Sequence, residues 1–278
     1  MPERDAILRD LYSEKKECVA PLPEWLLPKE KIHEYKAMAK VAIVEIAGRD
    51  SVAAAVKAVQ ERGFTDLIPT YAYTGTEHGP WQSIELAVSR LTRRLSETRI
   101  HELLLIGSPK FWQALNGRFA GSLIARYGFY APCVGCHLYL HSVRIPLSRL
   151  LGGIPVIAGE RESHDGKIKV NQISEALNAY VGLAEEFETE LILPLRHIHD
   201  GDRIRHLLGF EWKEGGEQLG CVLSGNYKGP DGKVHIGSSQ VRQYLEEFAY
   251  PVTRKIVSAY LDDRTPDHLK TASVLLDP

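Results

Sequence analysis

Short runs of hydrophobic residues alternate with longer segments of helical spacing along most of the chain. The short runs, rich in β-branched residues, predict buried strands at 41–46, 66–73, 102–106, 154–158 and 191–195. The longer segments predict helices at 51–62, 81–96, 118–127, 138–151, 174–187, 202–208 and 239–261. Strands that alternate with helices predict an α/β fold, in which helices cover both faces of a parallel sheet.

The same pattern divides the chain into three parts. Residues 1–37, with many charges and several prolines, predict an N-terminal arm of helix and irregular chain. Residues 38–225 hold the predicted strands and form the main domain, and residues 226–278 predict a C-terminal helical extension. A length of 278 residues, 44% of them hydrophobic and 25% charged, is typical of a globular protein and excludes a disordered chain, a collagen-like repeat and a coiled coil.

Charge is nearly balanced over the whole chain but not along it. The 34 Lys and Arg residues against 36 Asp and Glu residues give a net charge of −2, which predicts no strong general attraction to nucleic acid or membranes. Residues 90–149, however, contain nine basic and two acidic residues. This segment either forms a patch that binds the phosphates of RNA or spreads its charges over several faces, where they only solvate helices.

The N-terminus lacks the pattern of a signal peptide, and no apolar stretch approaches the roughly 20 residues that cross a membrane. Four cysteines in a chain of this length are too few for a disulfide scaffold and suit a reducing compartment. We therefore expect a cytoplasmic protein without a membrane partner, whose cysteines are ligands, catalysts or core residues.

One loop, Ile46-Ala-Gly-Arg-Asp-Ser51, joins the first predicted strand to the first predicted helix. The N–H groups at the start of a helix lack partners and carry partial positive charge, so they suit a phosphate. Gly48 would let the backbone approach such a ligand, Ser51 would donate its hydroxyl, and Asp50 would cap the helix or help to place Mg²⁺. An ordinary capped turn is the alternative, since neither a Walker A nor a GxGxxG sequence is present.

This loop resembles the signature Ser-Gly-Gly-x-Asp-Ser of the PP-loop ATP pyrophosphatase superfamily, whose fold is adenine nucleotide alpha-hydrolase-like. Gly48, Asp50 and Ser51 match the signature, whereas Ile46 and Ala47 depart from it. Similar runs at the ends of the second, fourth and fifth predicted strands follow in the family's order, so the resemblance covers residues 38–225. It implies that Asp50 is catalytic and that ATP, with Mg²⁺, is bound by Ala47, Gly48, Arg49, Asp50, Ser51, Thr74, Gly75, Gly159 and Glu160.

Three of the four cysteines form a second pattern. Cys133 and Cys136 are spaced C-x-x-C, and Cys221 stands alone after a glycine-rich loop. Thiolates at this spacing can share one metal ion but need further ligands. The set resembles that of the tRNA thiolation branch of the superfamily. The resemblance implies that Cys133, Cys136 and Cys221 hold a [4Fe–4S] cluster with one open iron, and that Cys133 and Cys221 take part in catalysis.

The cysteine pattern by itself leaves other sites open. A structural Zn²⁺ ion would use the three cysteines with His137 or Cys18 as the fourth ligand. A metal-free Cys133–Cys136 pair could relay persulfide sulfur, or the cysteines could be inert core residues. The sequence motif C-x-x-C-H, with His137 as the axial ligand, also occurs at haem c attachment sites. The chain shows no export signal and holds only two methionines, which disfavours a haem site.

The resemblance implies an ATP-dependent adenylating transferase or ligase. It would adenylate a substrate oxygen with release of pyrophosphate and then insert sulfur into a tRNA base, with tRNA, a sulfur-donor protein and a second copy of the chain as candidate partners. Amide or nitrile formation on a small acid is the second enzymatic interpretation. A nucleotide- or metal-binding protein without turnover is the third, because Ile46 and Ala47 replace residues that would contact phosphate.

Overall fold

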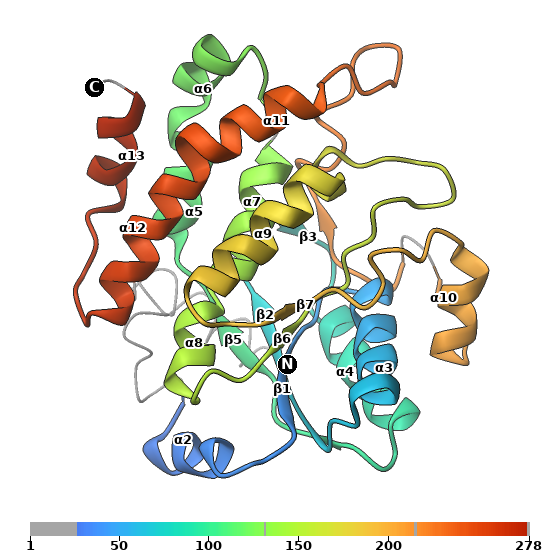
Figure 1. Cartoon of the computed structure of the whole chain (residues 1–278). Helices are drawn as coiled ribbons and strands as arrows, with labels where there is room; N and C mark the ends of the chain where they lie inside the picture. The colour runs from blue at the N-terminus through green and yellow to red at the C-terminus, as the bar shows by residue number, and fades with distance from the viewer. Residues whose placement is uncertain (1–26, 131, 214–215, 277–278) are drawn as a thin grey trace.

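A parallel sheet lies at the centre of the structure, a computed structural model that describes residues 27–130, 132–213 and 216–276 (Figure 1). Its strands follow the order β4-β2-β1-β6-β7, and β5 also pairs with β2. Every strand pair in this sheet is parallel. The strands are β1 (Val41–Glu45), β2 (Asp66–Ala72), β4 (Arg99–Ile100), β5 (Leu104–Ile106), β6 (Val156–Ile157) and β7 (Leu191–Ile192).

The central strand β1 is buried along its whole length. Side chains alternate across a strand, so Val41 and Ile43 join one hydrophobic core. Ala42 and Val44 point to the opposite face and join a second core. Burial on both faces explains why this strand is a continuous hydrophobic run in the sequence.

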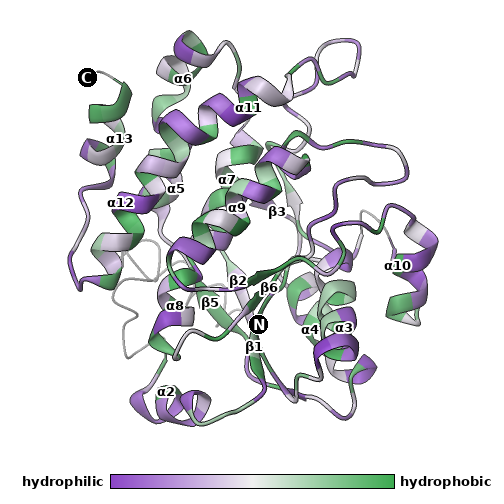
Figure 2. Ribbon diagram, in the orientation of Figure 1, coloured by the Kyte–Doolittle hydropathy of each residue, from purple (hydrophilic) through white to green (hydrophobic). Residues whose placement is uncertain are grey.

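Helices cover both faces of the sheet, which confirms the predicted fold class. One core lies between the sheet and the helices α3 (Arg49–Arg62), α4 (Gln82–Arg94) and α10 (Gly201–Leu208). The other lies between the sheet and the helices α5 (Pro109–Leu115), α7 (Pro132–Ser142), α8 (Ile145–Leu150), α9 (Ser174–Glu186) and α12 (Tyr250–Leu261). In Figure 2 the central strands are largely hydrophobic, whereas the outer helix α2 (Lys29–Lys36) is mostly hydrophilic.

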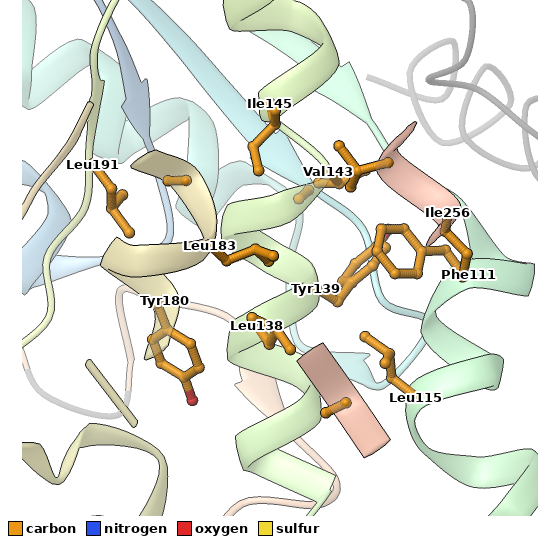
Figure 3. Packing of buried hydrophobic residues seen from close by; sticks show 14 of the residues in the cluster. Phe111, Leu115, Leu138, Tyr139, Val143, Ile145, Tyr180, Leu183, Leu191 and Ile256 are labelled. Carbon is orange, nitrogen blue, oxygen red and sulfur yellow. The ribbon is translucent and has the colours of Figure 1, made fainter. Parts of the chain in front are cut away.

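Helix α7 lies in the middle of its core, with packed side chains on both sides (Figure 3). On one side Tyr139 meets Phe111 of α5 edge-on, with ring centroids 5.5 Å apart. On the other side lie Tyr180 and Leu183 of α9. The Tyr180 hydroxyl donates to the carbonyl of Val134, in the first turn of α7, at 3.1 Å. This packing fixes the N-terminal turn of α7, which contains the C-x-x-C pair.

Two predicted helix boundaries are wrong. The helix expected at 138–151 begins at Pro132 as α7 and is followed by the separate helix α8, which has Pro146 in its first turn. Proline suits both starts because its missing N–H would have no partner in a first turn. The single helix expected at 239–261 is three segments, namely α11 (Ser238–Tyr244), a π-helical turn (Leu245–Ala249) and α12.

Several short elements were not predicted from the sequence. They are β3 (Glu77–His78), β8 (Gly220–Cys221), α5, α13 (His268–Leu276), the strand β4 and the 3₁₀ turns Gly117–Phe119 and Val170–Gln172. Helix α6 (Ala120–Tyr127) lies where the sequence predicts it. Residues of α11, α12 and α13 pack into the same core as the sheet, and the division of the chain at 37 and 225 stays a prediction. In the described part of the chain, no helix is long and apolar enough to cross a membrane.

Candidate active site

The loop after β1 is closed by the hydroxyl group of Ser51. Its oxygen accepts hydrogen bonds from the N–H groups of Ala47 and Gly48, both at 3.0 Å. The hydroxyl donates its proton to the carbonyl of Gly48 at 2.7 Å. Ser51 therefore shapes the loop and the start of α3, and its role in binding a ligand stays a prediction.

The carboxylate of Asp50 is enclosed by positively charged groups. One oxygen accepts from Arg49 Nε at 3.0 Å, and the other lies 3.3 Å from Arg161 Nη1. Arg161 is completely buried and also donates to the carbonyls of Ile198 and His199, both at 2.9 Å. Asp50 thus ties the first turn of α3 to the loop that follows β7, and Mg²⁺ would have to compete with both guanidinium groups for its oxygens.

Gly159, at the end of β6, packs directly against this first turn. A Cβ atom at Gly159 would lie 2.6 Å from the carbonyl carbon of Asp50 and from the nitrogen of Ser51. The backbone of Asp50 and Ser51 could not lie this close to a residue with a Cβ atom unless it moved. The close approach brings the next two residues, Glu160 and Arg161, to the end of β1.

A cavity of about 420 Å³ lies over this loop and is called the loop cavity here. Most of the residues predicted to bind ATP line it, because the carboxyl ends of β1 and β6 are adjacent in the sheet. These residues are Ala47, Gly48, Arg49, Asp50, Ser51, Gly159 and Glu160. Thr74 lines the neighbouring cavity instead, and Gly75 forms a turn with a φ of 80° outside both linings.

The short antiparallel pair β3–β8 joins two segments that are far apart in the sequence. Glu77 pairs with Cys221, which places the late cysteine at the end of β2. The turn before β3 is fixed by Thr74, whose N–H and hydroxyl donate to Glu77 Oε1 at 2.7 and 3.0 Å. The Thr76 hydroxyl lies 3.2 Å from the sulfur of Cys221.

The three described cysteines line one cavity of about 250 Å³, called the cysteine cavity here. Burial raises the pKa of Cys133 to about 11 and raises that of Cys136 further. Burial thus favours the neutral thiol over the thiolate at both positions. A bound metal deprotonates coordinating thiols. The three sulfurs line one cavity, but among the described residues they do not form a group whose donor atoms all lie within 4.8 Å of one another, so in this conformation they are too far apart to ligate one single ion together. Cys18 lies outside the described residues.

The two cavities are neighbours and share part of their lining. The shared residues are Glu45, Ala47, His137, Lys169 and Leu219. A ligand in the loop cavity therefore lies beside a ligand in the cysteine cavity.

A buried cluster beneath this shared lining was not predicted from the sequence. His137 Nδ1 and His141 Nε2 lie 2.6 and 3.1 Å from the same oxygen of Glu160. Burial lowers the pKa of His141, but the carboxylates of Glu45 and Glu160 outweigh this and raise it to about 9. The signal in the sequence is the spacing of the two histidines, four residues apart, which places them on one face of a helix.

Five of the nine basic residues in the segment 90–149 pair with acidic residues. Arg144 is buried and contacts Glu45 at 3.1 Å. Arg90 forms a bidentate pair with Glu217, at 2.7 and 2.8 Å. Arg99, Arg126 and Arg149 also contact acidic residues from outside the segment. Much of the local positive charge is therefore neutralised in the folded chain.

The contact at Gly159 generates a test of this geometry. Gly159→Ala is expected to lower the free energy of unfolding by about 1–3 kcal/mol, because the added methyl group has to displace backbone. Gly182→Ala in α9 is the matched control, since a Cβ there meets nothing within 4 Å and alanine favours a helix by up to about 1 kcal/mol. Urea unfolding measures both. Equal stabilities of the two variants would contradict the close approach.

The proteins to which this chain is similar include a sequence relative and several solved structures, two of which are described here. The chain matches no protein-family model. One structure is a predicted subunit of a tRNA methyltransferase from Methanocaldococcus jannaschii, with a TM-score of 0.36 and 14% identity, covering 76% of this chain and 88% of that chain. The other is the U34-tRNA thiolase NcsA from Methanococcus maripaludis with its [4Fe-4S] cluster, with a TM-score of 0.40 and 14% identity, covering 96% of this chain and 80% of that chain. The fold assignment rests on the strand order of the sheet and on the helices that cover both of its faces.

The sequence relative is much closer. The uncharacterized protein MJ0009 of Methanocaldococcus jannaschii is 42% identical over 222 residues, which cover 78% of this chain and 80% of the relative. Identity of this extent over most of both chains means that they share one fold. The chain belongs to the family of MJ0009.

Proposed function

We propose that the chain is an ATP-dependent adenylating enzyme that modifies tRNA. The observation that carries this proposal is the position of the loop cavity. It lies where the strand order of the sheet reverses, between β1 and β6, which is the place where open α/β sheets bind ligands. The three-cysteine cavity adjoins it, so one active site would hold both a nucleotide and a sulfur-handling group.

In this proposal the loop cavity holds the phosphates of ATP. The first N–H groups of α3 supply partial positive charge, and Arg49 and Lys169 in the lining supply full charges. A substrate oxygen attacks the α-phosphorus of ATP, a new P–O bond forms, and the bond to pyrophosphate breaks. The cationic side chains, with Mg²⁺, stabilise the charge that develops on the leaving pyrophosphate. Asp50 acts as a positioning residue that orients Arg49 and Arg161.

The cysteine cavity lies on the side of the site where the activated substrate would lie. Cys133 and Cys136 from α7 and Cys221 from β8 would hold a [4Fe–4S] cluster, which supplies a site for the sulfide that replaces the adenylated oxygen. The chain's own residues hold the three thiols in place. The pair β3–β8 fixes Cys221, and the packing of α7 fixes the other two.

A small acid is the second candidate substrate. The observation that favours it is the neutralisation of basic residues in 90–149, which removes much of the charge expected to hold RNA. The first step, adenylation with release of pyrophosphate, would be the same. Amide or nitrile formation would then replace sulfur insertion.

The nucleotide site is tested by substitution of Asp50. Asp50→Asn is expected to weaken ATP binding by about 10-fold or more, because it removes the charge that holds Arg49 and Arg161 in position, and a hydrogen bond to a charged group contributes about 1.5–3 kcal/mol. Asp262→Asn is the control, since Asp262 is exposed and its carboxylate pairs with Arg264 near the C-terminal end of the chain. Calorimetric titration with ATP and Mg²⁺ measures both. Equal affinities in the two variants would remove the loop cavity as the nucleotide site.

The cysteine site is tested by colour and metal content after anaerobic purification. We expect brown protein with iron and sulfide, and we expect Cys133→Ser, Cys136→Ser and Cys221→Ser each to lose the colour. Cys18→Ser, in the segment outside the described residues, should keep it. Colourless protein that holds Zn²⁺, and loses about one Zn²⁺ per chain in each of the three serine variants, would replace the cluster by a structural zinc site at the cysteines. Colourless protein without metal would remove sulfur insertion from the proposal.

A further inference from the structure

His137, His141 and Glu160 form a compact group of metal-binding side chains between the two cavities. One donor atom from each lies within 4.8 Å of the other two, a grouping found once among the residues that the structure describes. Glu160 Oε1 lies 2.6 Å from His137 Nδ1 and 3.1 Å from His141 Nε2. In a tetrahedral site with metal–ligand distances of about 2.0–2.1 Å, the ligand atoms lie about 3.4 Å from one another. A small movement of the three donor atoms away from one another would therefore make room for an ion.

The two histidines are presented by one face of α7. They are four residues apart, a spacing that places both imidazoles side by side on a helix. Glu160 comes from the opposite direction, in the segment after β6, where the close approach of Gly159 fixes its backbone. The three donors therefore come from two rigid elements whose relative position is already fixed.

Each buried ligand has a partner that would orient it. His141 Nδ1 lies 3.2 Å from Glu45, whose carboxylate is held by Arg144 at 3.1 Å. The other oxygen of Glu160 accepts a hydrogen bond from Gln172. A histidine that presents one nitrogen to a metal and the other to a carboxylate is the usual second-shell arrangement of metal sites.

The group is open on one side only. The side chains of His141 and Glu160 are 2% and 3% exposed, whereas that of His137 is 27% exposed and lines both cavities. Two buried carboxylates, Glu45 and Glu160, face the buried guanidinium of Arg144, and Lys169 in the shared lining adds a positive charge near Glu160. Both carboxylates contact the imidazole of His141, so a proton on His141 or a bound metal ion would add further positive charge between them.

We propose that His137 Nδ1, His141 Nε2 and Glu160 Oε1 bind one divalent first-row transition cation such as Zn²⁺. Two imidazoles and one carboxylate suit Zn²⁺, Co²⁺ or Fe²⁺ better than Mg²⁺, which prefers oxygen ligands. Three protein ligands leave at least one coordination position, and it faces the shared lining of the loop and cysteine cavities. This site is separate from the three cysteines and does not depend on the proposed adenylation.

The test uses Co²⁺ as the probe, in a full-length variant with Cys133, Cys136 and Cys221 all replaced by serine. This background removes the three thiols of the cysteine cavity, so Co²⁺ bound by His137, His141 and Glu160 should show visible d–d bands without sulfur-to-metal charge transfer. We expect about one Co²⁺ per chain, not displaced by excess Mg²⁺. His137→Ala in this background should weaken binding by well over 10-fold, because even second-shell partners change affinity by about 10–100-fold. His197→Ala, an exposed histidine, is the matched control.

Two results would overturn the site. One is the absence of Co²⁺ binding by the serine background, which would leave His141 as a protonated bridge between carboxylates. The other is binding that His137→Ala leaves unchanged. His141→Ala is less useful because loss of a buried side chain can unfold the chain, whereas His137 is partly exposed and its replacement can be checked by thermal unfolding. Neither result bears on ATP binding, so the metal site can be disproved without disproving the proposed function, and the reverse is also true.

Discussion

The close approach of Gly159 to the first turn of α3 is the contact on which the rest of the site depends. It brings the ends of β1 and β6 together at the point where the strand order reverses. From there Glu160 reaches the histidines of α7, and Arg161 reaches Asp50. One backbone contact thus sets the positions of the loop cavity and of the buried cluster. It also explains why a glycine is required at a position that has no strained φ angle of its own.

The second constraint is electrostatic. Ionisable groups buried beneath the shared lining lose the solvation of water, and each is retained only because a partner of opposite charge faces it. Burial raises the pKa of Glu160, but the two histidines of α7 hold it well below its ordinary value. Arg161 is buried in the same way against Asp50 and two carbonyl groups. A set of matched charges of this kind resists rearrangement, which keeps the two neighbouring cavities in a fixed geometry.

The sheet and the loop could be predicted from the sequence because their signals are local. The run at 41–46 is hydrophobic throughout because β1 is buried on both faces, and Gly63 ends α3 with a φ of 67°. The contacts of the loop could not be predicted in the same way. The sequence suggests a ligand-binding hydroxyl at Ser51, whereas the structure shows that hydroxyl closing the loop.

The parts that escaped prediction depend on contacts between distant segments. The strands β3 and β8 have two residues each, too few for a periodic signal, and only their pairing places Cys221 beside Thr76. The start of α7 at Pro132 moves the C-x-x-C pair from a loop into a helix and puts His137 and His141 in phase. Local charge counting at 90–149 could not show which basic residues are paired, because partners such as Glu217 and Glu45 lie elsewhere in the chain.

The central claim is that one site activates an RNA oxygen with ATP. Exchange of labelled pyrophosphate into ATP tests it most directly, measured with unfractionated tRNA before and after digestion by ribonuclease. The account predicts exchange that requires intact tRNA, because the adenylated oxygen belongs to a base. Exchange that requires a small carboxylic acid would keep adenylation and remove RNA as the substrate. The absence of exchange under every condition, by protein that is folded and binds ATP, would contradict the account.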